Sequence, residues 1–211
     1  MNILIEKLTE TDFPTIFKYD DLSKLDLEKG FLDNLLKESL ASNEIIDISN
    51  NIFTLNKLYR KHLLSWQVIS QKLVPDFYVS LEFVLSDVSW IPEAVYTVTC
   101  VTKGEPFFLD TKKYGRYRYI NLPAKNLLAG VEEAEDDNGA YKVAKPLKAL
   151  ADIICRDEYN WTTLYPLHES FRIEDEDLET LTAKDFDELQ GSCEVKNVED
   201  FLCGIRKELK I

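Results

Sequence analysis

The sequence of 211 residues predicts an α+β protein with an N-terminal domain over 1–55, a helical connector over 56–75 and a mixed α+β domain with an antiparallel sheet over 76–211. Three observations support this fold class. The first part contains helical patterns followed by two short apolar runs around an Asn-Asn pair. No linker rich in Ser, Gly or Pro follows, so an ordered segment must join the parts, and the helical stretch 56–73 is the candidate. The remainder mixes helical patterns with runs of β-branched and aromatic residues.

The N-terminal part is predicted to be short helices followed by a hairpin. An extended piece around Phe17 leads into a helix at about 20–25, with Asp20 as its N-cap. The next helix covers 28–41, because apolar residues recur there at helical spacing: Phe31, Leu32, Leu35, Leu36 and Leu40. Asn tolerates the positive φ that two-residue hairpin turns require, so Asn50 and Asn51 predict a β-hairpin over 44–55. Helix, strand, helix, helix and hairpin is the order of a winged helix-turn-helix.

The C-terminal part combines strands with helices whose ends carry local signals. Ser80 is the predicted N-cap of a helix that Pro92 closes. Strand-like runs at 95–101, 106–109 and 116–122 suggest an antiparallel meander. A strand at 141–144 leads into a helix with Pro146 near its first position. Thr182 and Asp185 form a capping box for a later helix, and a last helix follows Asn197.

The net charge of −13 is unevenly distributed along the chain. Residues 1–75 carry 9 basic and 11 acidic side chains, 76–165 carry 10 and 14, and 166–211 carry 6 and 13. An opposite island lies within the middle block, because Lys103 to Lys125 holds six basic residues against two acids. Two dense acidic runs, Glu132–Asp137 and Glu174–Glu179, are expected to be solvated loops. The total charge therefore does not exclude DNA binding by the near-neutral first part.

Cysteine usage and hydropathy indicate the compartment. No apolar run approaches the ~18 residues that span a bilayer, and acids stand where a signal peptide would be apolar, so we expect a cytoplasmic protein with no membrane partner. None of the cysteines belongs to a CxxC pair, which argues against a disulfide framework or zinc knuckle; they are Cys100, Cys155, Cys193 and Cys203.

Four ordered blocks of sequence resemble a known family. They are Tyr78 to Glu82 (YVSLE), Ile91 to Thr99 (IPEAVYTVT), Tyr114 to Tyr119 (YGRYRY) and Tyr141 to Asp152 (YKVAKPLKALAD). In these blocks, over roughly residues 17–156, the chain is similar to the AbiEi-type antitoxins of bacterial abortive-infection, or type IV toxin–antitoxin, systems. The resemblance implies an N-terminal winged helix-turn-helix that binds the promoter of its own operon. It also implies a C-terminal antitoxic domain that opposes a nucleotidyltransferase-like toxin, in a protein that is not an enzyme.

The predicted DNA-binding residues are few. On the 28–41 helix they are Lys29, Asn34 and Lys37, and at the hairpin tip Asn50 and Asn51. The lysines stand against Glu28, Asp33 and Glu38 on the same helix. Phosphate contacts supply the sequence-independent part of affinity, so few cations predict weak, salt-sensitive binding. The Asn side chains are suited to read adenine.

Two groups are candidates for the antitoxic or partner surface. The first is Lys112, Lys113, Arg116 and Arg118, interleaved with tyrosines. These residues either form a surface for nucleic acid, a phosphate-rich ligand or an acidic toxin face, or belong to an ordinary amphipathic strand with tyrosines inside. The second is Lys148 and Asp152, four apart on a helix and either functional or a surface ion pair.

Two other function classes compete with the antitoxin. A winged helix that has lost DNA binding would leave a protein-interaction module whose acidic surface recruits a basic partner. A phosphodiester enzyme would use the acidic clusters and Lys148. The chain has two histidines, His62 and His168, which are far apart in the sequence and do not suggest a catalytic triad or a His-metal site. We therefore expect no catalytic residue, metal or cofactor.

Overall fold

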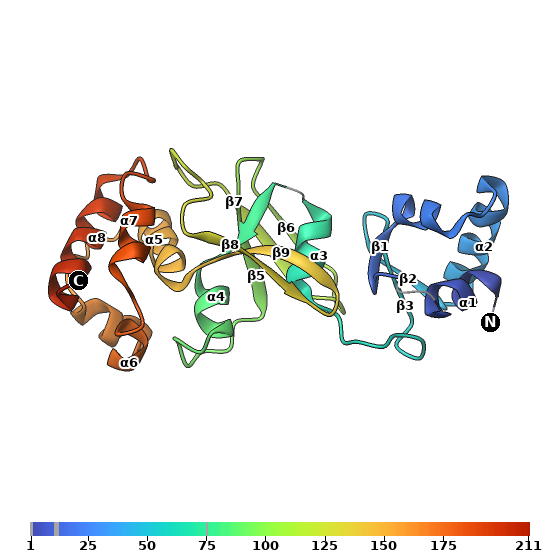
Figure 1. The fold of residues 1–211 in the computed structure, drawn as a ribbon, viewed down its shortest axis with the longest axis horizontal. Coiled ribbons are helices and arrows are strands. Elements are labelled where there is room, and N and C mark those ends of the chain that lie inside the picture. Colours follow the sequence, from blue (N-terminus) through green and yellow to red (C-terminus); the bar gives the residue numbers. More distant parts are fainter. Residues whose placement is uncertain (1, 11–12, 75) are drawn as a thin grey trace. The chain divides into compact units, whose positions relative to one another are not determined.

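The computed structural model describes residues 2–10, 13–74 and 76–211. Its contacts divide the chain into two compact units. Unit 1 comprises Met1–Pro75, Thr111–Tyr114 and Glu135–Tyr141, and unit 2 comprises Asp76–Asp110, Gly115–Ala134 and Lys142–Ile211. Figure 1 shows the helices and strands of both units. The protein is a mixed α+β structure, and among the described residues no helix is both long and apolar enough to cross a membrane.

Unit 1 consists of short helices and a small antiparallel sheet. Its elements are α1 (Ile3–Glu10), β1 (Ile16–Lys18), the 3-10 helix η1 (Tyr19–Leu25), α2 (Lys29–Ala41), β2 (Ile45–Ser49), β3 (Ile52–Leu55) and α3 (Trp66–Leu73). The sheet order is β1-β3-β2, with β3 antiparallel to both neighbours. The core cluster joins one face of α2, represented by Leu32, Leu35 and Leu36, to α1 and the sheet.

Local sequence explains both ends of α2 and the hairpin that follows it. The Glu28 carboxylate accepts hydrogen bonds from the backbone amides of Gly30 and Phe31, each at 3.0 Å, which satisfies two exposed donors of the first helical turn. Asn50 and Asn51 both adopt positive φ, of 52° and 59°. The predicted helix and hairpin turn are therefore confirmed.

Two details of unit 1 differ from the sequence predictions. Asp20 is not an N-cap: η1 begins at Tyr19, and the neighbouring Asp21 carboxylate accepts a hydrogen bond from the Lys18 amide at 2.9 Å. The helical connector predicted over 56–75 is reduced to α3, because residues 56–65 form turns and bends without a helix. Ser65 then caps α3 by accepting from the Val68 amide at 3.2 Å.

Unit 2 is built on a six-stranded mixed sheet in the order β6-β7-β5-β4-β9-β8. The strands are β4 (Phe77–Val79), β5 (Thr97–Thr102), β6 (Phe107–Asp110), β7 (Arg116–Ile120), β8 (Val131–Asp136) and β9 (Gly139–Ala144). The expected antiparallel meander is wrong, because β7 lies between β5 and β6 and runs parallel to β5. Strands β6 and β7 form a hairpin, and its second strand, β7, pairs with β5, which makes that pair parallel. Strands β4 and β9 form a second parallel pair.

The acidic run Glu132–Asp137 is mostly a strand rather than the expected loop. It belongs to β8, at one edge of the sheet. Charged side chains on an edge strand discourage pairing with a strand of another chain, which explains why carboxylates are suited to β8. The second run, Glu174–Glu179, contains the one-turn helix α6 (Asp175–Leu178).

The remaining helices of unit 2 are α4 (Glu82–Asp87), α5 (Pro146–Asp157), the π-helix η2 (Leu167–Phe171), α7 (Ala183–Leu189) and α8 (Lys196–Leu209). Pro146 is the first residue of α5, and Thr182 and Asp185 form the capping box of α7, as predicted. Helix α8 packs against α5 and α7, with Val198, Phe201, Leu202 and Ile205 buried. Its Gly204 meets the backbone of Thr162.

Replacing Gly204 by Ala tests this close approach. A Cβ at this position would overlap the carbonyl oxygen of Thr162, so the backbone must shift. We expect a loss of about 1–3 kcal/mol in the free energy of unfolding, although Ala favours a helix by about 1 kcal/mol over Gly. Cys203→Ala, at the exposed neighbouring position, is the control and should be neutral or stabilising. Urea denaturation measures both; a more stable Gly204→Ala variant would contradict the packing.

Candidate functional site

Helix α5 carries an ion pair that is buried, not on the surface. The Nζ of Lys148 lies 2.8 Å from Oδ1 of Asp152, and the two side chains are 6% and 4% exposed. The expectation of a surface pair is therefore wrong. Every residue from Leu147 to Cys155 is buried, because α5 packs against α4, α7 and α8. A helix covered on all sides leaves no solvent-exposed face for polar residues.

The second oxygen of Asp152 binds two hydroxyl groups from the segment that contains β4. Oδ2 accepts from Tyr78 Oη at 2.9 Å and from Ser80 Oγ at 2.7 Å. The Lys148 ammonium lies 5.4 Å from the centre of the Tyr78 ring, within cation–π range. We refer to these four residues as the Asp152 network: Tyr78, Ser80, Lys148 and Asp152. Both carboxylate oxygens are thus satisfied, which is the condition under which a buried charge is tolerated.

Burial fixes the protonation of the Tyr78 hydroxyl. Desolvation raises the pKa of Tyr78 well above its usual range, and the adjacent Asp152 carboxylate raises it further. The hydroxyl therefore remains a donor to Asp152 at every physiological pH.

The backbone after Ser80 is strained. Leu81 has φ 61° and ψ −149°, a region that glycine occupies almost alone. Ser80 is therefore not the predicted N-cap of α4: Leu81 holds that position without a side-chain cap, and the Ser80 hydroxyl binds Asp152 instead. The Ser80 amide donates to the carbonyl of Thr99 on β5 at 2.9 Å. These two bonds hold the strained turn between β4 and α4.

The geometry of the Asp152 network suits positioning rather than chemistry. Ser80 and Tyr78 are fully buried, so a substrate has no route to either hydroxyl in this conformation. The hydroxyls donate to a carboxylate and do not meet a histidine base. Across the described residues, no group of three or more His, Cys, Asp or Glu side chains is arranged to hold a metal ion. The network instead joins α5 to β4 and its following turn.

Strand β7 presents two exposed cations of unit 2. Arg116 and Arg118 are exposed, whereas Tyr117 and Tyr119 are buried, so the predicted alternation is confirmed. The Arg118 guanidinium lies 5.9 Å from the centre of the Phe108 ring on β6. Arg118 pairs in register with Thr99, and Thr99 bonds Ser80. Because adjacent strands are about 4.8 Å apart, Arg118 stands roughly 10 Å across the sheet from Ser80.

The other basic residues of the island lie around β7. Lys112 and Lys113 are exposed in the turn before it, in a segment assigned to unit 1. Lys103 and Lys125, at the ends of the island, line a cavity of about 420 Å³ together with Lys142 and Asp76. The structure does not place Lys148 and Asp152 on this surface, so the predicted partner residues divide into exposed cations and a buried pair.

All five predicted DNA-binding residues are exposed on unit 1. Asn34 and Lys37 are three residues apart on the outer face of α2, and Asn50 and Asn51 form the hairpin tip. Lys29 lies in the first turn of α2. In the described part of the chain, neither Lys29 nor Lys37 forms an ion pair.

Two of the acids that oppose these lysines have local structural roles. Glu28 caps α2, and Asp33 accepts a hydrogen bond from the Tyr19 hydroxyl at 2.5 Å. This bond raises the pKa of Tyr19. The acidic character that sequence analysis found on α2 is therefore explained in part by the helix start and its attachment to η1.

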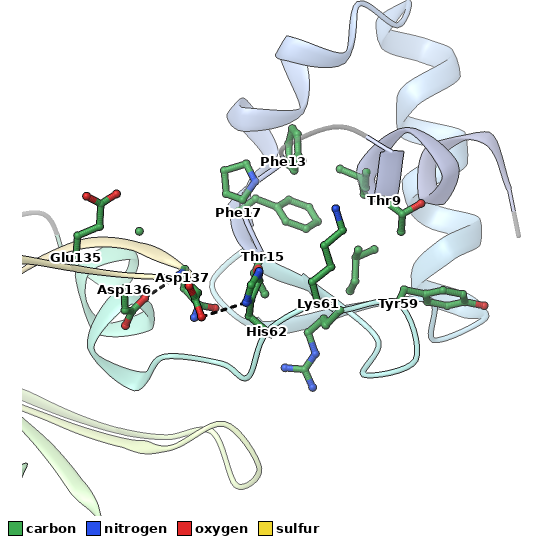
Figure 2. A pocket seen from close by; sticks show the side chains of 16 residues that line it. Thr9, Phe13, Thr15, Phe17, Tyr59, Lys61, His62, Glu135, Asp136 and Asp137 are labelled. Carbon is green, nitrogen blue, oxygen red and sulfur yellow. Dashed lines mark hydrogen bonds and ion pairs between the residues drawn. The ribbon is translucent and has the colours of Figure 1, made fainter.

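Unit 1 also contains a cavity of about 300 Å³ that sequence analysis did not predict. Figure 2 shows two of its aromatic side chains, Phe13 and Phe17, whose ring centres lie 5.4 Å apart in an edge-to-face arrangement. On another side the Nδ1 of His62 lies 3.1 Å from the Asp137 carboxylate. The lining mixes apolar and charged groups without a recognisable catalytic arrangement.

Replacing Asp152 by Ala tests how much the Asp152 network contributes to the free energy of unfolding. The change leaves the buried Lys148 ammonium without its partner, so we expect a loss of about 3–5 kcal/mol in the free energy of unfolding. Asp200→Ala is the matched control, because Lys196 and Asp200 form an exposed pair with the same spacing on α8. Its loss should be below about 0.5 kcal/mol. Equal losses in urea denaturation would show that burial of the Lys148–Asp152 pair has no energetic importance.

Comparison with known proteins gives a distant similarity to a solved structure. No protein-family model matches the chain. No curated protein matches it either. Among solved structures, the chain is similar to the crystal structure of the RV2827C protein from Mycobacterium tuberculosis, with 11% sequence identity and a TM-score of 0.49. The alignment covers 98% of this chain and 78% of that chain. At this level the similarity carries no argument about function.

Proposed function

We propose that this protein is an antitoxin and transcriptional regulator of the AbiEi-like, type IV toxin–antitoxin class. In this proposal unit 1 is a winged helix-turn-helix that binds promoter DNA, and unit 2 opposes a nucleotidyltransferase-like toxin. Both activities are binding events without catalysis. The proposal rests on the resemblance of the four sequence blocks and on the arrangement of the exposed residues in each unit.

The arrangement of unit 1 is the observation that carries the proposal. The order α1, β1, η1, α2, β2, β3 and the sheet order β1-β3-β2 are those expected for a winged helix. In such a domain the helix before the hairpin enters the major groove, and the hairpin contacts neighbouring backbone or groove. Helix α2 and the Asn50–Asn51 turn occupy these positions and expose the five polar residues described above.

The charge of unit 1 determines how DNA binding should behave. Lys29 and Lys37 are the cations of α2, so few phosphates are neutralised and non-specific affinity is low. Asn34, Asn50 and Asn51 supply amides that read base edges. Binding should therefore depend on sequence more than on charge.

Replacing Lys37 by Ala tests the DNA interface. We expect weaker binding to the protein's own upstream DNA at low salt, and a reduction of about 0.9 in the slope of log affinity against log salt, because one phosphate contact is lost. Lys184→Ala, an equal charge change at an exposed site on α7, is the control and should bind like the unmodified protein. Fluorescence anisotropy over a salt series measures both. Absence of binding at micromolar unmodified protein would remove the DNA-binding role.

The toxin-facing role is assigned to the exposed side of β7. Arg116 and Arg118 are exposed on a strand at the interior of a sheet, which holds them rigidly. The Asp152 network holds the same sheet to α5 through Ser80. Rigid presentation reduces the entropy lost on binding, and Arg is enriched in interface hot spots.

Loss of both arginines tests this surface. In cells that express a nucleotidyltransferase-like toxin encoded beside this gene, the unmodified protein should restore growth. The Arg116→Ala, Arg118→Ala double variant should restore less, because two interface anchors are absent. The control is Lys184→Ala with Lys196→Ala, which removes the same charge from exposed helix positions. Equal rescue by both double variants would contradict the assignment, and a neighbouring gene of another kind would remove the toxin from the proposal.

A second candidate function is a protein-interaction module for a basic partner. The exposed carboxylates around α6 favour it, namely Glu174, Asp175, Glu176 and Glu179. The two candidates predict different complexes. The module predicts a stoichiometric protein complex that survives nuclease treatment and dissociates in high salt, together with no binding to upstream DNA.

A further inference from the structure

Two thiols of unit 2 face each other at the end of α5. The sulfurs of Cys155 and Cys193 are 3.8 Å apart. Cys155 lies in the last turn of α5, three residues after Asp152, and Cys193 lies in the segment between α7 and α8. All four cysteines of the chain are free thiols. The pair joins segments 38 positions apart in the sequence, so its proximity is a product of the tertiary fold.

The two thiols differ in their surroundings. Cys155 is buried, whereas Cys193 is partly exposed. The Val195 amide donates a hydrogen bond to the Cys193 sulfur at 3.4 Å, which favours the thiolate. The exposed thiol is therefore the one that a small oxidant reaches first, and the buried thiol stands behind it.

The shifts in the pKa values of the two thiols also favour Cys193 as the thiol that reacts first. The contact with the Cys155 thiol holds the pKa of Cys193 well below its usual range, and the Val195 amide and the Lys148 charge act in the same direction against the opposing effect of burial. The same contact and burial raise the pKa of Cys155. Of the two sulfurs, the outer one is therefore the better nucleophile.

We propose that Cys193 and Cys155 are a peroxide-oxidised dithiol, in which Cys193 reacts with a hydroperoxide and Cys155 resolves the product to an intramolecular disulfide. The Cys193 thiolate attacks one peroxide oxygen, the O–O bond breaks, and the other oxygen leaves as an alcohol or water after taking a proton. Cys193 is then a sulfenic acid. Cys155 attacks its sulfur, the S–S bond forms and the S–O bond breaks. The departing hydroxide takes the Cys155 proton and leaves as water. The hydroperoxide is reduced by two electrons and the two thiols are oxidised by two.

The local structure permits the closure. A disulfide needs its sulfurs about 2.0 Å apart, so they must approach each other by roughly 1.8 Å. Gly191, two residues before Cys193, adopts φ +70°, and a Cβ there would meet no atom within 4 Å, so the space beside Gly191 is open. The bond would tie α5 to residues that hold a neighbouring loop, because Ser192 accepts hydrogen bonds from the amides of Lys125 and Asn126.

Oxidation of the full chain tests the proposal, and it does so independently of any DNA or toxin activity. Reduced protein is treated with one equivalent of hydrogen peroxide, remaining thiols are alkylated under denaturing conditions, and peptides are mapped without reduction. We expect a peptide pair linked through Cys155 and Cys193 that dithiothreitol separates. The rate should rise with pH to a midpoint below the ~8.5 of an unperturbed thiol.

Three single variants distinguish this pair from general thiol oxidation. Cys155→Ser should accumulate a Cys193 sulfenic acid, which dimedone traps, and Cys193→Ser should leave Cys155 reduced. Cys203→Ser, which removes an exposed thiol on α8, should form the disulfide at the unmodified rate. The proposal is wrong if unmodified protein yields no Cys155–Cys193 peptide, or if Cys203 is oxidised as fast as Cys193. The mapping of unmodified protein decides this even where a variant does not fold.

Discussion

The buried charge pair of Lys148 and Asp152 is the constraint on which unit 2 depends. A carboxylate removed from water is tolerated only when its oxygens are fully bonded, and here one ammonium and two hydroxyls complete that set. The two hydroxyl donors come from β4 and the turn after it, so satisfying the charge fixes α5 against the sheet. The same requirement holds Ser80 in place beside the strained backbone of Leu81. An apolar contact of equal area would stabilise these elements without specifying their register so closely.

The structural roles of polar groups bear on the proposed function of each unit. In unit 2 some polar groups of the four family-like blocks lie inside, including Ser80, Lys148 and Asp152, and the arginines of β7 are among the residues that remain exposed. In unit 1 the acids of α2 partly serve local structure, because Glu28 caps the helix and Asp33 accepts a hydrogen bond from Tyr19. Cys155 lies one helical turn beyond Asp152 on α5, so the proposed disulfide with Cys193 would form next to the element that organises unit 2.

Features that depend on neighbouring residues could be predicted from the sequence, and features that depend on distant ones could not. The amphipathic helix α2, the Asn50–Asn51 turn, the Thr182 capping box and the alternation of β7 all follow from spacing within a few residues. Ser80 has the local signature of an N-cap, but its partner is 72 residues away. The parallel pairing of β5 and β7 likewise depends on where a hairpin docks. One signal for the buried pair was present: between Leu147 and Cys155 only Lys148 and Asp152 are polar, so the helix has almost no face for solvent.

Hydrogen–deuterium exchange of the full chain, with and without its own upstream DNA at low salt, tests most directly the central assignment of DNA binding to unit 1 and not to unit 2. The amides of a helix and hairpin that contact DNA should exchange more slowly in the complex. The account predicts added protection in α2 and in the β2–β3 hairpin, with β7 unchanged. Protection confined to residues 103–125, or no change anywhere in the chain, would contradict it.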